Sequence, residues 1–549
     1  MKITRRSLAA ATTALVLCFG LVSCGGGGSD PDRARTLHIG NGAEPLSLDP
    51  HQASGVWENR IIGDMLQGLT TENAQGLPIP GMATEWSTSP DGLVWTFKLR
   101  DAKWSDGQPV TANDFVFAWQ RIMTTTPPAK YASILFVVKN AEKIYNGEIK
   151  DPNQLGVRAI DDRTLEVTLE HPAPYLPGLL THYTSFPIPK HVVEKVGKDW
   201  IKPENFVGNG PYKLQQWKPN DFVHLVRNTN FYDNANVCID QAFFYPTADD
   251  NAAERKVRAG DLDINTNFSG ARLEEINKNL PGYARIHGYT GLTYYIFNMR
   301  KDVFKDVRVR AALSMTADRD FITKQILKAG QQPAYSLVPP GINDYQTGAM
   351  TVDFKDQNME TRYAQARKLL EEAGYGPNKP LKFTFSFRNT GDNPRVAPVV
   401  QQNWAKIAPW VQVEILGGEA QIHYEKLRTG DFELGDAGWI SDFNDAKNFS
   451  FLFQTSTDQL NYGKYSNAEY DRLMAAADLE KDTLKRANMM KQAEAIVLKE
   501  HGFMPMWFLT NRNLVSPRVT GWVDNAVDIH RVRYLCTTDA QKAPAPAKP

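Results

Sequence analysis

The chain has 549 residues, of which 42% are apolar and 23% are charged, so it can form a folded core and is long enough for more than one domain. Its 62 basic and 62 acidic residues balance, and no long run of like charge occurs. This composition excludes general disorder and provides no basic surface of the kind that nucleic-acid binding requires.

Residues 1–23 are expected to be a signal peptide. Met1–Arg6 is basic, and Leu8–Val22 is apolar but too short to cross a bilayer comfortably. The segment Leu21-Val22-Ser23-Cys24 resembles the lipobox of bacterial lipoproteins, which implies that Cys24 carries lipid and becomes the new N terminus. An ordinary signal peptide that contains a cysteine is the alternative. Residues 24–35 are expected to form a flexible, glycine-rich tether.

Two cysteines, Cys238 and Cys536, remain beyond the lipid-bearing position. In an oxidising compartment they can form one disulfide, or they can be two buried free thiols. The spacing leaves both alternatives open, because it does not establish that their Cα atoms come close enough for a bond.

Strand and helix patterns alternate along the rest of the chain, which predicts a mixed α/β fold. Alternating apolar residues predict strands at 36–39, 95–99, 164–169, 224–227, 294–297, 383–387 and 411–415. Apolar residues at helical spacing predict helices at 115–122, 308–314, 363–372 and 470–479. Thr111 to Asp114 should cap the first of these helices. The tail 536–549, which ends in a Pro/Ala-rich stretch, is expected to be disordered.

Motifs that carry catalysis are missing from the sequence. It contains no nucleophile elbow, zinc helix, Cys-x-x-Cys pair or phosphate loop, and its ten histidines are scattered singly. Acid pairs such as Asp161-Asp162 and Asp249-Asp250 lie in polar, turn-like stretches, where a solvated loop is the better explanation. The sequence therefore gives no sign of an enzyme, a metal site or a cofactor, and a non-catalytic function is expected if it explains the rest of the chain better.

A long motif between Gly92 and Phe115 resembles the signature of the peptide/nickel (oligopeptide-binding) family of solute-binding proteins that serve ABC importers. Further matches follow in the family's order at Ser47–His51, Gly208–Tyr212, Phe304–Leu313 and Ala437-Gly438-Trp439. The resemblance covers about residues 36–535 and is strongest to the oligopeptide-binding members of enterobacteria.

This resemblance implies a two-lobed periplasmic-binding-protein fold with a hinge and an additional inserted domain, three domains in all. Lobe I is expected at residues 36–69, 190–288 and 508–535, the inserted domain at 70–189 and lobe II at 289–507. A ligand is expected to be enclosed when the lobes close about the hinge.

The resemblance also implies a binding site. A peptide backbone is expected to pair with Ser54-Gly55-Val56 in one lobe and with Gly438-Trp439-Ile440 in the other. Asp442 is expected to accept the ligand's ammonium group, with Tyr131 and Trp439 lining the pocket. The alternatives are a turn residue that caps its own backbone for Asp442, and core packing for the two aromatic residues.

Some positions depart from the family pattern. Asp436 stands where the enterobacterial member has an arginine, and Arg428 lies near, but not at, another of its basic positions. The group that meets a peptide's carboxylate, and with it the preferred peptide length, is therefore left open. The member's cysteines at the positions of Ile440 and near Gly291 are also absent.

Together these features predict a monomeric, membrane-anchored lipoprotein of the periplasm or cell envelope. Its expected ligands are short peptides with a free amino terminus, which it would deliver to the permease subunits of an ABC importer. Within the same family, the alternative ligands are a muropeptide, a metal chelate or haem. An enzyme or a periplasmic chaperone is the alternative outside the family.

Overall fold

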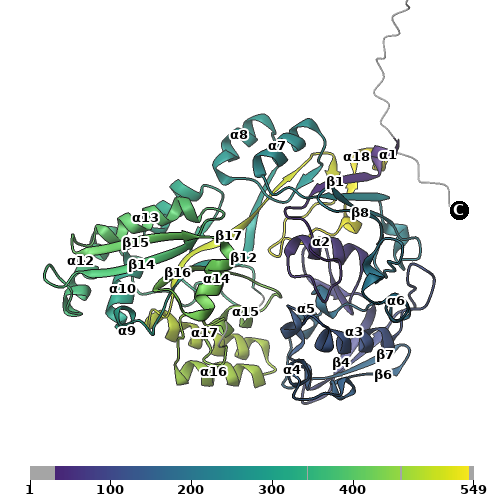
Figure 1. Ribbon diagram of the computed structural model, residues 1–549, viewed down its shortest axis with the longest axis horizontal. Helices are drawn as coiled ribbons and strands as arrows, with labels where there is room; N and C mark the ends of the chain where they lie inside the picture. Colours follow the sequence, from purple (N-terminus) through teal and green to yellow (C-terminus); the bar gives the residue numbers. More distant parts are fainter. Residues whose placement is uncertain (1–30, 343, 458–459, 543–549) are drawn as a thin grey trace, which may run out of the picture.

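The computed structural model describes residues 31–342, 344–457 and 460–542, so the predicted signal peptide, Cys24 and most of the tether lie outside the described residues. Figure 1 shows two halves that are joined by long strands. Within the described ranges, no helix is both long enough and apolar enough to cross a bilayer.

One large sheet runs through both halves (Figure 1). Its strands lie in the spatial order β15-β14-β16-β12-β17-β11-β1-β10-β9-β8, and β13 pairs with β17 beside this path. The bounds in chain order are β1 Thr36–Gly40, β8 Tyr212–Lys218, β9 Phe222–Arg227, β10 Gln241–Tyr245, β11 Ile264–Asn265, β12 Ala284–Phe297, β13 Gln332–Pro333, β14 Leu381–Arg388, β15 Val411–Gly418, β16 Leu434–Ile440 and β17 Met504–Val515.

A separate antiparallel sheet in the order β4-β5-β7-β6 falls within residues 70–189, the range predicted for the inserted domain. Two small two-stranded sheets, β2-β3 and β18-β19, complete the strands of the described residues. The bounds are β2 Thr70–Glu72, β3 Pro78–Pro80, β4 Ala83–Thr88, β5 Val94–Leu99, β6 Val157–Asp161, β7 Thr164–Thr168, β18 Val519–Thr520 and β19 Cys536–Thr537.

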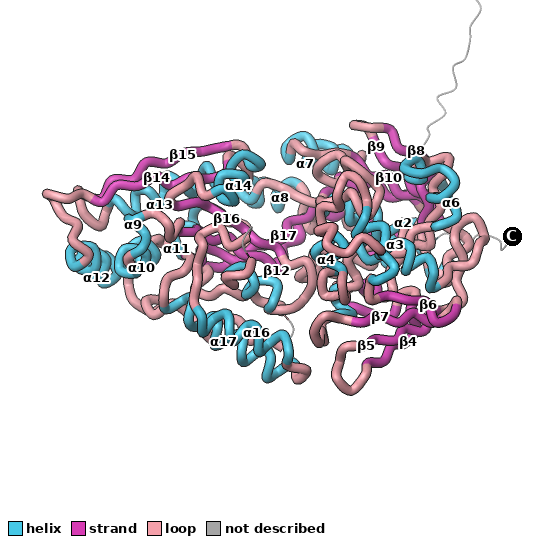
Figure 2. The backbone as a smooth tube through the Cα atoms, turned by 60° about the horizontal axis from the view of Figure 1, so that its bottom comes forward, coloured by secondary structure: helices cyan, strands magenta, loops and turns pink. Residues whose placement is uncertain are grey.

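Helices pack around these sheets in both halves (Figure 2). The α-helices are α1 Pro31–Ala34, α2 Val56–Met65, α3 Ala112–Thr124, α4 Ala141–Tyr145, α5 Leu176–Leu179, α6 Lys190–Val196, α7 Asp250–Ala259, α8 Leu273–Asn279, α9 Asp302–Lys305, α10 Val307–Thr316, α11 Arg319–Phe321, α12 Met359–Glu372, α13 Asn393–Ala405, α14 Ala420–Thr429, α15 Lys447–Ser450, α16 Ala468–Leu479, α17 Thr483–Lys499 and α18 Thr538–Lys542. Short 3-10 turns and one π-helical turn, Ile322–Leu327, connect them.

The local patterns in the sequence predict these elements well. Each predicted strand and helix occurs, and the mixed α/β prediction is confirmed. In α3, Thr111 is the N-cap residue and Asp114 closes a capping box, with a 2.8 Å bond from the Thr111 backbone N–H to the Asp114 carboxylate. Because this box satisfies backbone N–H groups that have no partner within the helix, α3 begins at Ala112, three residues before its apolar run.

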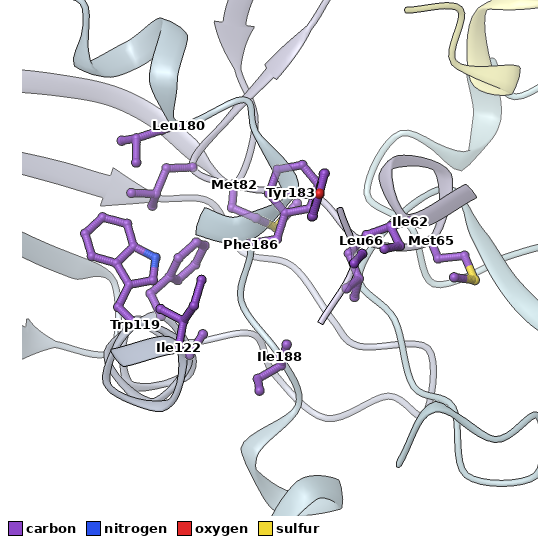
Figure 3. Packing of buried hydrophobic residues seen from close by; sticks show 14 of the residues in the cluster. Ile62, Met65, Leu66, Met82, Trp119, Ile122, Leu180, Tyr183, Phe186 and Ile188 are labelled. Carbon is purple, nitrogen blue, oxygen red and sulfur yellow. The ribbon is translucent and has the colours of Figure 1, made fainter. Parts of the chain in front are cut away.

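The apolar core forms two large clusters. One joins residues of the predicted lobe I to residues of the predicted inserted domain. Figure 3 shows Met65, at the end of α2, and the following Leu66 in the same packed group as Trp119 of α3 and Phe186. The other cluster lies between residues 292 and 508. The inserted segment thus shares its core with lobe I, whereas the second half has a core of its own.

Strands β12 and β17 carry the chain from one half to the other (Figure 1). Their antiparallel register slips between the pairs Gly288↔Thr510 and Leu292↔Phe508, which leaves a bulge where the strands cross. Beside it, a Cβ at Gly291 would lie 2.6 Å from the Leu509 Cδ1 and 3.1 Å from the Trp439 carbonyl oxygen, so the strands approach closely there. The predicted boundaries between lobe I and lobe II, 288/289 and 507/508, lie at this irregularity.

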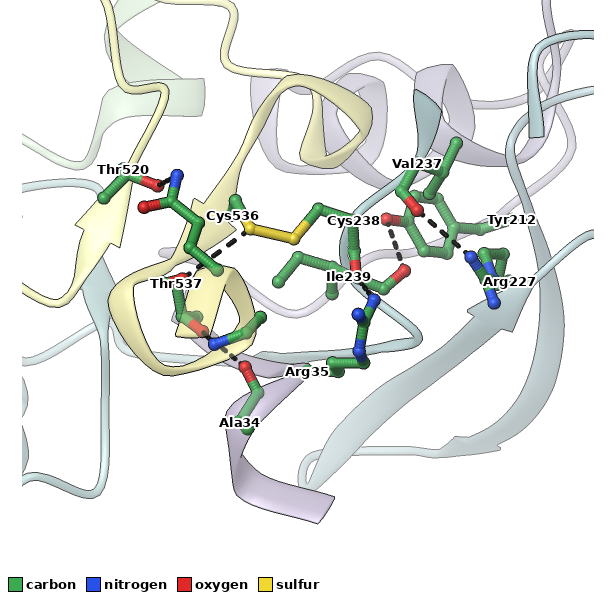
Figure 4. The surroundings of a disulfide bond; sticks show 12 residues. Ala34, Arg35, Tyr212, Arg227, Val237, Cys238, Ile239, Thr520, Cys536 and Thr537 are labelled. Atoms are coloured by element: carbon green, nitrogen blue, oxygen red, sulfur yellow. Dashed lines mark hydrogen bonds between the residues drawn. A yellow bond between two sulfur atoms is a disulfide. The ribbon is translucent and has the colours of Figure 1, made fainter. Parts of the chain in front are cut away.

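Cys238 and Cys536 are joined by a disulfide, with their Cα atoms 5.4 Å apart (Figure 4). The Thr537 hydroxyl donates to the Ala34 carbonyl, and β19 pairs with β18. These contacts hold the end of the described chain to lobe I.

Two predictions of disorder need correction. Residues 536–542 of the expected tail form β19 and α18, because the disulfide and the β18 pairing fix them, while residues 543–549 lie outside the described range. The last part of the expected tether forms helix α1, which is fixed by a 3.0 Å ion pair between Arg33 and the buried Asp263. A composition rich in glycine, alanine and proline did not reveal these tertiary contacts.

Candidate ligand-binding site

A cavity of about 770 Å³ lies between the two halves of the molecule. Its walls come from both sides of the bulge in β12 and β17, and they include residues of the predicted inserted domain. The lining residues fall within residues 54–60, 72–78, 130–131, 178–183, 421–428, 438–444 and 527–531, together with Tyr289 and Tyr462. A ligand in this cavity would therefore touch both halves at once.

Every residue predicted for the ligand site lines this one cavity: Ser54, Gly55, Val56, Tyr131, Gly438, Trp439, Ile440 and Asp442. They come from three parts of the chain that are far apart in sequence. The fold thus brings the predicted residues together, and their roles toward a ligand stay predictions.

Strand β16 presents an open edge to the cavity. On one side it pairs with β12 along its whole length, from Leu434 to Ile440. On the other side β14 pairs with it only at Leu434 and Gly435. The remaining edge, which includes Gly438 and Ile440, lies in the cavity wall. An unpaired strand edge is the feature to which an extended peptide can add as a further strand.

The opposite wall has a different backbone. Gly55 is extended, and Val56 begins helix α2. The N–H groups of Ser54 and Gly55 already donate to the Glu58 carboxylate, at 3.3 and 2.5 Å. The N–H groups of Ser54 and Gly55 are therefore not free to pair with a ligand on this wall.

Asp442 lies in the loop that follows β16. Burial raises the pKa of its carboxyl to about 7, against a partial opposing effect of a hydrogen bond with Asn448. The backbone N–H of Lys447 in this loop is capped by Asp445, at 2.8 Å, and not by Asp442. A carboxylate that is costly to ionise in its cavity would be stabilised by a cationic ligand.

The two predicted aromatic residues differ in their surroundings. Burial and the charge of Asp442 both raise the pKa of the Tyr131 hydroxyl, so Tyr131 lies at the Asp442 end of the cavity. Trp439 donates from Nε1 to Asn448 at 2.7 Å and packs edge to face on Phe451, with ring centroids 5.5 Å apart. Trp439 therefore serves both the core and the cavity wall.

Two arginines in the cavity wall were missed in the sequence because their partners are remote. Arg60 forms a 3.0 Å ion pair with the buried Asp528, and Arg531 forms a 3.2 Å pair with the buried Glu72. Residues so far apart along the chain give no local pattern. Only the fold could show that Asp528 neutralises Arg60 and that Glu72 neutralises Arg531.

Asp436, which departs from the family pattern, is fully buried behind the cavity wall. Its carboxylate accepts from Arg388 at 2.7 Å and lies 3.1 Å from the His423 ring. The pKa of Asp436 is lowered because these partners outweigh the large effect of burial. The acid at this position is therefore neutralised within the protein and presents no free negative charge to the cavity.

An aromatic contact bridges the two halves beside the cavity. Tyr175, from the predicted inserted domain, stacks on Phe443, with ring centroids 5.2 Å apart and planes 11° from parallel. The Arg486 guanidinium lies 4.9 Å from the centre of the Tyr175 ring. Lys481 also donates to the Pro90 carbonyl, where α16 and α17 approach the β4–β5 hairpin (Figure 2). Phe443 follows Asp442 directly, so this contact ties the Asp442 loop to the other half.

Among the residues that the structure describes, no group of three or more His, Cys, Asp or Glu side chains is arranged to hold a metal ion.

The comparisons with known proteins agree on one family. The model of the bacterial extracellular solute-binding proteins, family 5, matches residues 78–461. The chain is 36% identical to the periplasmic murein peptide-binding protein MppA of Escherichia coli, over 90% of this chain and 91% of the relative. It is also 36% identical to the periplasmic oligopeptide-binding protein OppA of Haemophilus influenzae, over 90% of this chain and 92% of the relative. The crystal structure of that OppA in complex with RPPGFSPFR superposes with a TM-score of 0.79, covering 92% of this chain and 99% of the other.

Proposed function

The chain belongs to the bacterial extracellular solute-binding proteins of family 5, and from this premise we propose that it captures short peptides with a free amino terminus. The peptide is enclosed between the two halves and handed to the permease subunits of an ABC-type importer. The role is one of binding and not of catalysis.

One observation carries this proposal: the cavity places the Asp442 carboxyl just beyond the open edge of β16. The edge offers backbone hydrogen bonds that any peptide can make, whatever its side chains. The carboxyl offers a charge partner to the ammonium group that every unmodified peptide has at its first residue. Together they favour peptides as a class over neutral or anionic solutes.

A muropeptide is the second candidate ligand. The relative named for binding murein peptides supports it, and the free amino groups of such a peptide would use the same acid. Metal chelates and haem offer no ammonium group to Asp442, so the site gives them less support.

Mass spectrometry of the small molecules that are released when the purified protein is denatured tests the proposal. We expect a mixture of short peptides with free amino termini. Peptides with D-amino acids and diaminopimelate would favour the muropeptide, and release of a haem, a chelate or a sugar would contradict peptide capture.

We further propose that the protein is a lipoprotein of the cell envelope, held to a membrane through lipid on Cys24 and acting as a monomer. The lipobox-like segment supports the anchor. Two or more acyl chains would hold the protein stably at the bilayer. The tether would then place the cavity outside the cytoplasm, where an importer collects its ligands.

A further inference from the structure

We propose that the outer side of the sheet at β1, β10 and β9 lies against the surface of the membrane that holds the lipid anchor. Five side chains form this aromatic face: His38, Phe222, His224, Phe243 and Tyr245. The inference rests on the anchor in the proposed function and is independent of peptide capture.

The three strands have one side in the core and one side that faces outward. Successive side chains in a strand point to opposite sides of its sheet. The side chains of one set are each 5% exposed or less: Leu37, Ile39, Val223, Leu225, Ala242 and Phe244. The alternate set is the aromatic face, and all of its side chains are only half-buried. Tyr245 packs against the small cluster under α7 and α8, whereas Phe222 and Phe243 belong to none of the apolar clusters of the described residues.

The rings of the aromatic face form one continuous surface. Phe243 is stacked between His38 and His224, with ring centroids 5.2 and 4.0 Å away and planes 7° from parallel in both pairs. Phe222 packs edge-on against Phe243 and Tyr245, at 5.6 and 6.4 Å. The Tyr245 hydroxyl lies 2.8 Å from Nδ1 of His38. Apolar rings with paired polar tips suit the boundary between water and lipid.

The proposed anchor lies within a short distance of this face. Seven peptide units separate Cys24 from Pro31, where α1 begins, and they can span at most about 25 Å. Helix α1 packs against β1, at the end of the molecule where Figure 1 shows β1 and β8. Arg33 of α1 lines a second cavity, of about 500 Å³, together with His38 and Tyr245. Lipid on Cys24 would therefore hold the edge of the aromatic face close to the bilayer.

Cations border the aromatic face. Arg33 and Lys256 line the second cavity at its edge, together with one acid, Asp261. Lys213 of β8 is exposed on the same outward side of the sheet, since it lies between two buried residues of that strand. Basic side chains near a bilayer are attracted to anionic headgroups. The charge at the border of the face thus favours a membrane that contains acidic lipids.

Only weak attraction is needed for this contact. A surface that a short linker ties to its partner meets that partner at an effective concentration in about the millimolar range. The aromatic face also shares no residue with the lining of the ligand cavity. Contact of this face with the membrane would therefore orient the protein without using any residue of the ligand site.

Photolabelling from the membrane tests the inference. The full lipidated chain is reconstituted in vesicles of phosphatidylethanolamine and phosphatidylglycerol that contain a lipid with a diazirine beside its headgroup. Labelled peptides are identified by mass spectrometry in the wild type, in Phe222→Gln/Phe243→Gln and in Leu479→Gln/Leu484→Gln. The last protein is the matched control, since Leu479 and Leu484 are 66% and 63% exposed and lie in the half that contains α16 and α17 (Figure 1).

In the wild type and in the control, the label should concentrate in residues 222–245 and stay at background in residues 411–418, at the opposite end of the sheet. In Phe222→Gln/Phe243→Gln, labelling of residues 222–245 should fall about fivefold or more, the factor that burial of the exposed part of two Phe rings corresponds to. Circular dichroism checks that this variant is folded. If it is not, the distribution of label in the wild type decides alone.

Label that is spread evenly over both halves, or concentrated in residues 411–418, would overturn the inference. So would an unlabelled face in a protein that dimerises through it, with a dimer that dissociates in Phe222→Gln/Phe243→Gln. A chain that carries no lipid and stays off the vesicles would refute the anchor and this inference together, while peptide capture would stand.

Discussion

Replacing Asp442 by Asn should abolish most of the affinity for peptides with a free amino terminus. Burial raises the pKa of the Asp442 carboxyl from an ordinary 3.8 to about 7, which corresponds to a cost of about 4 kcal/mol for the charged form. A bound ammonium group must offset that cost. Asn keeps the shape of the side chain but leaves the ammonium without a partner, at a loss of about 3–5 kcal/mol.

The expected loss is therefore about 10²–10⁴-fold in Kd. Calorimetry at pH 7.5 with trialanine and N-acetyl-trialanine, against the wild type and Asp442→Asn, yields the four constants of a double-mutant cycle. Acetylation removes the ligand's charge, so it should weaken binding to the wild type by a similar factor and to Asp442→Asn by less than about fivefold. Asp431→Asn, at an exposed acid outside the cavity lining, should behave as the wild type.

If N-acetylation of the peptide weakens its binding to the wild type and to Asp442→Asn by the same factor, Asp442 is not the partner of the ammonium group and this reasoning is refuted. The pH profile supplies an independent check. Ionised Asp442 requires a pH above about 7, and a charged α-amino group requires a pH below about 8. Peptide affinity in the wild type should therefore peak between these two pH values. The decrease in affinity below about pH 7 should be missing in Asp442→Asn.

Four further outcomes are expected. Folding raises the pKa of Asp442, so the free-energy cost of burying its charged carboxylate is absent below pH 3.8 and complete above about pH 7. Asp442→Asn should therefore unfold at a higher temperature than the wild type at pH 8 but not at pH 3.5. Equal changes in the unfolding temperature at the two pH values would contradict this. Tyr175→Ala removes the stack between the halves and should enlarge the radius of gyration in small-angle scattering, with saturating peptide restoring the compact form; an unchanged radius would count against the contact. Cys536→Ser, which opens the bond to Cys238, should cost about 2–5 kcal/mol in denaturant unfolding, and the reasoning fails if stability is unaffected. Cys24→Ala should leave a folded protein that no longer sediments with membranes, and full membrane retention would rule out the lipid anchor.

Local signals in the sequence predicted the elements of the fold where neighbouring residues determine them. The capping box at Thr111 and Asp114 is one case, since every partner lies within four residues. Strand β12 is the opposite case, because only Tyr294–Phe297 has the pattern of a buried strand. The first ten of its fourteen residues, from Ala284 to Thr293, are mostly polar or glycine, and pairing with the distant β17 makes them part of the strand.

The candidate site could be predicted only in part. The family resemblance identified eight of the cavity-lining residues, and four of these, including Asp442, belong to the contiguous motif around Trp439. The neutralisation of Asp436 by Arg388 could not be foreseen, since the two lie 48 residues apart and come together only through the pairing of β14 with β16.

The open edge of β16 has a consequence for how this protein can evolve. An edge that holds a ligand through its backbone does not depend on which side chains it bears, so its contribution survives most substitutions. Asp442, the residue proposed to hold the ligand's ammonium group, lies outside this strand, in the loop after β16. Under the proposed function, substitutions in that loop would change which ligands are bound, while the pairing of β16 with its neighbouring strands, and with it the fold, would stay the same.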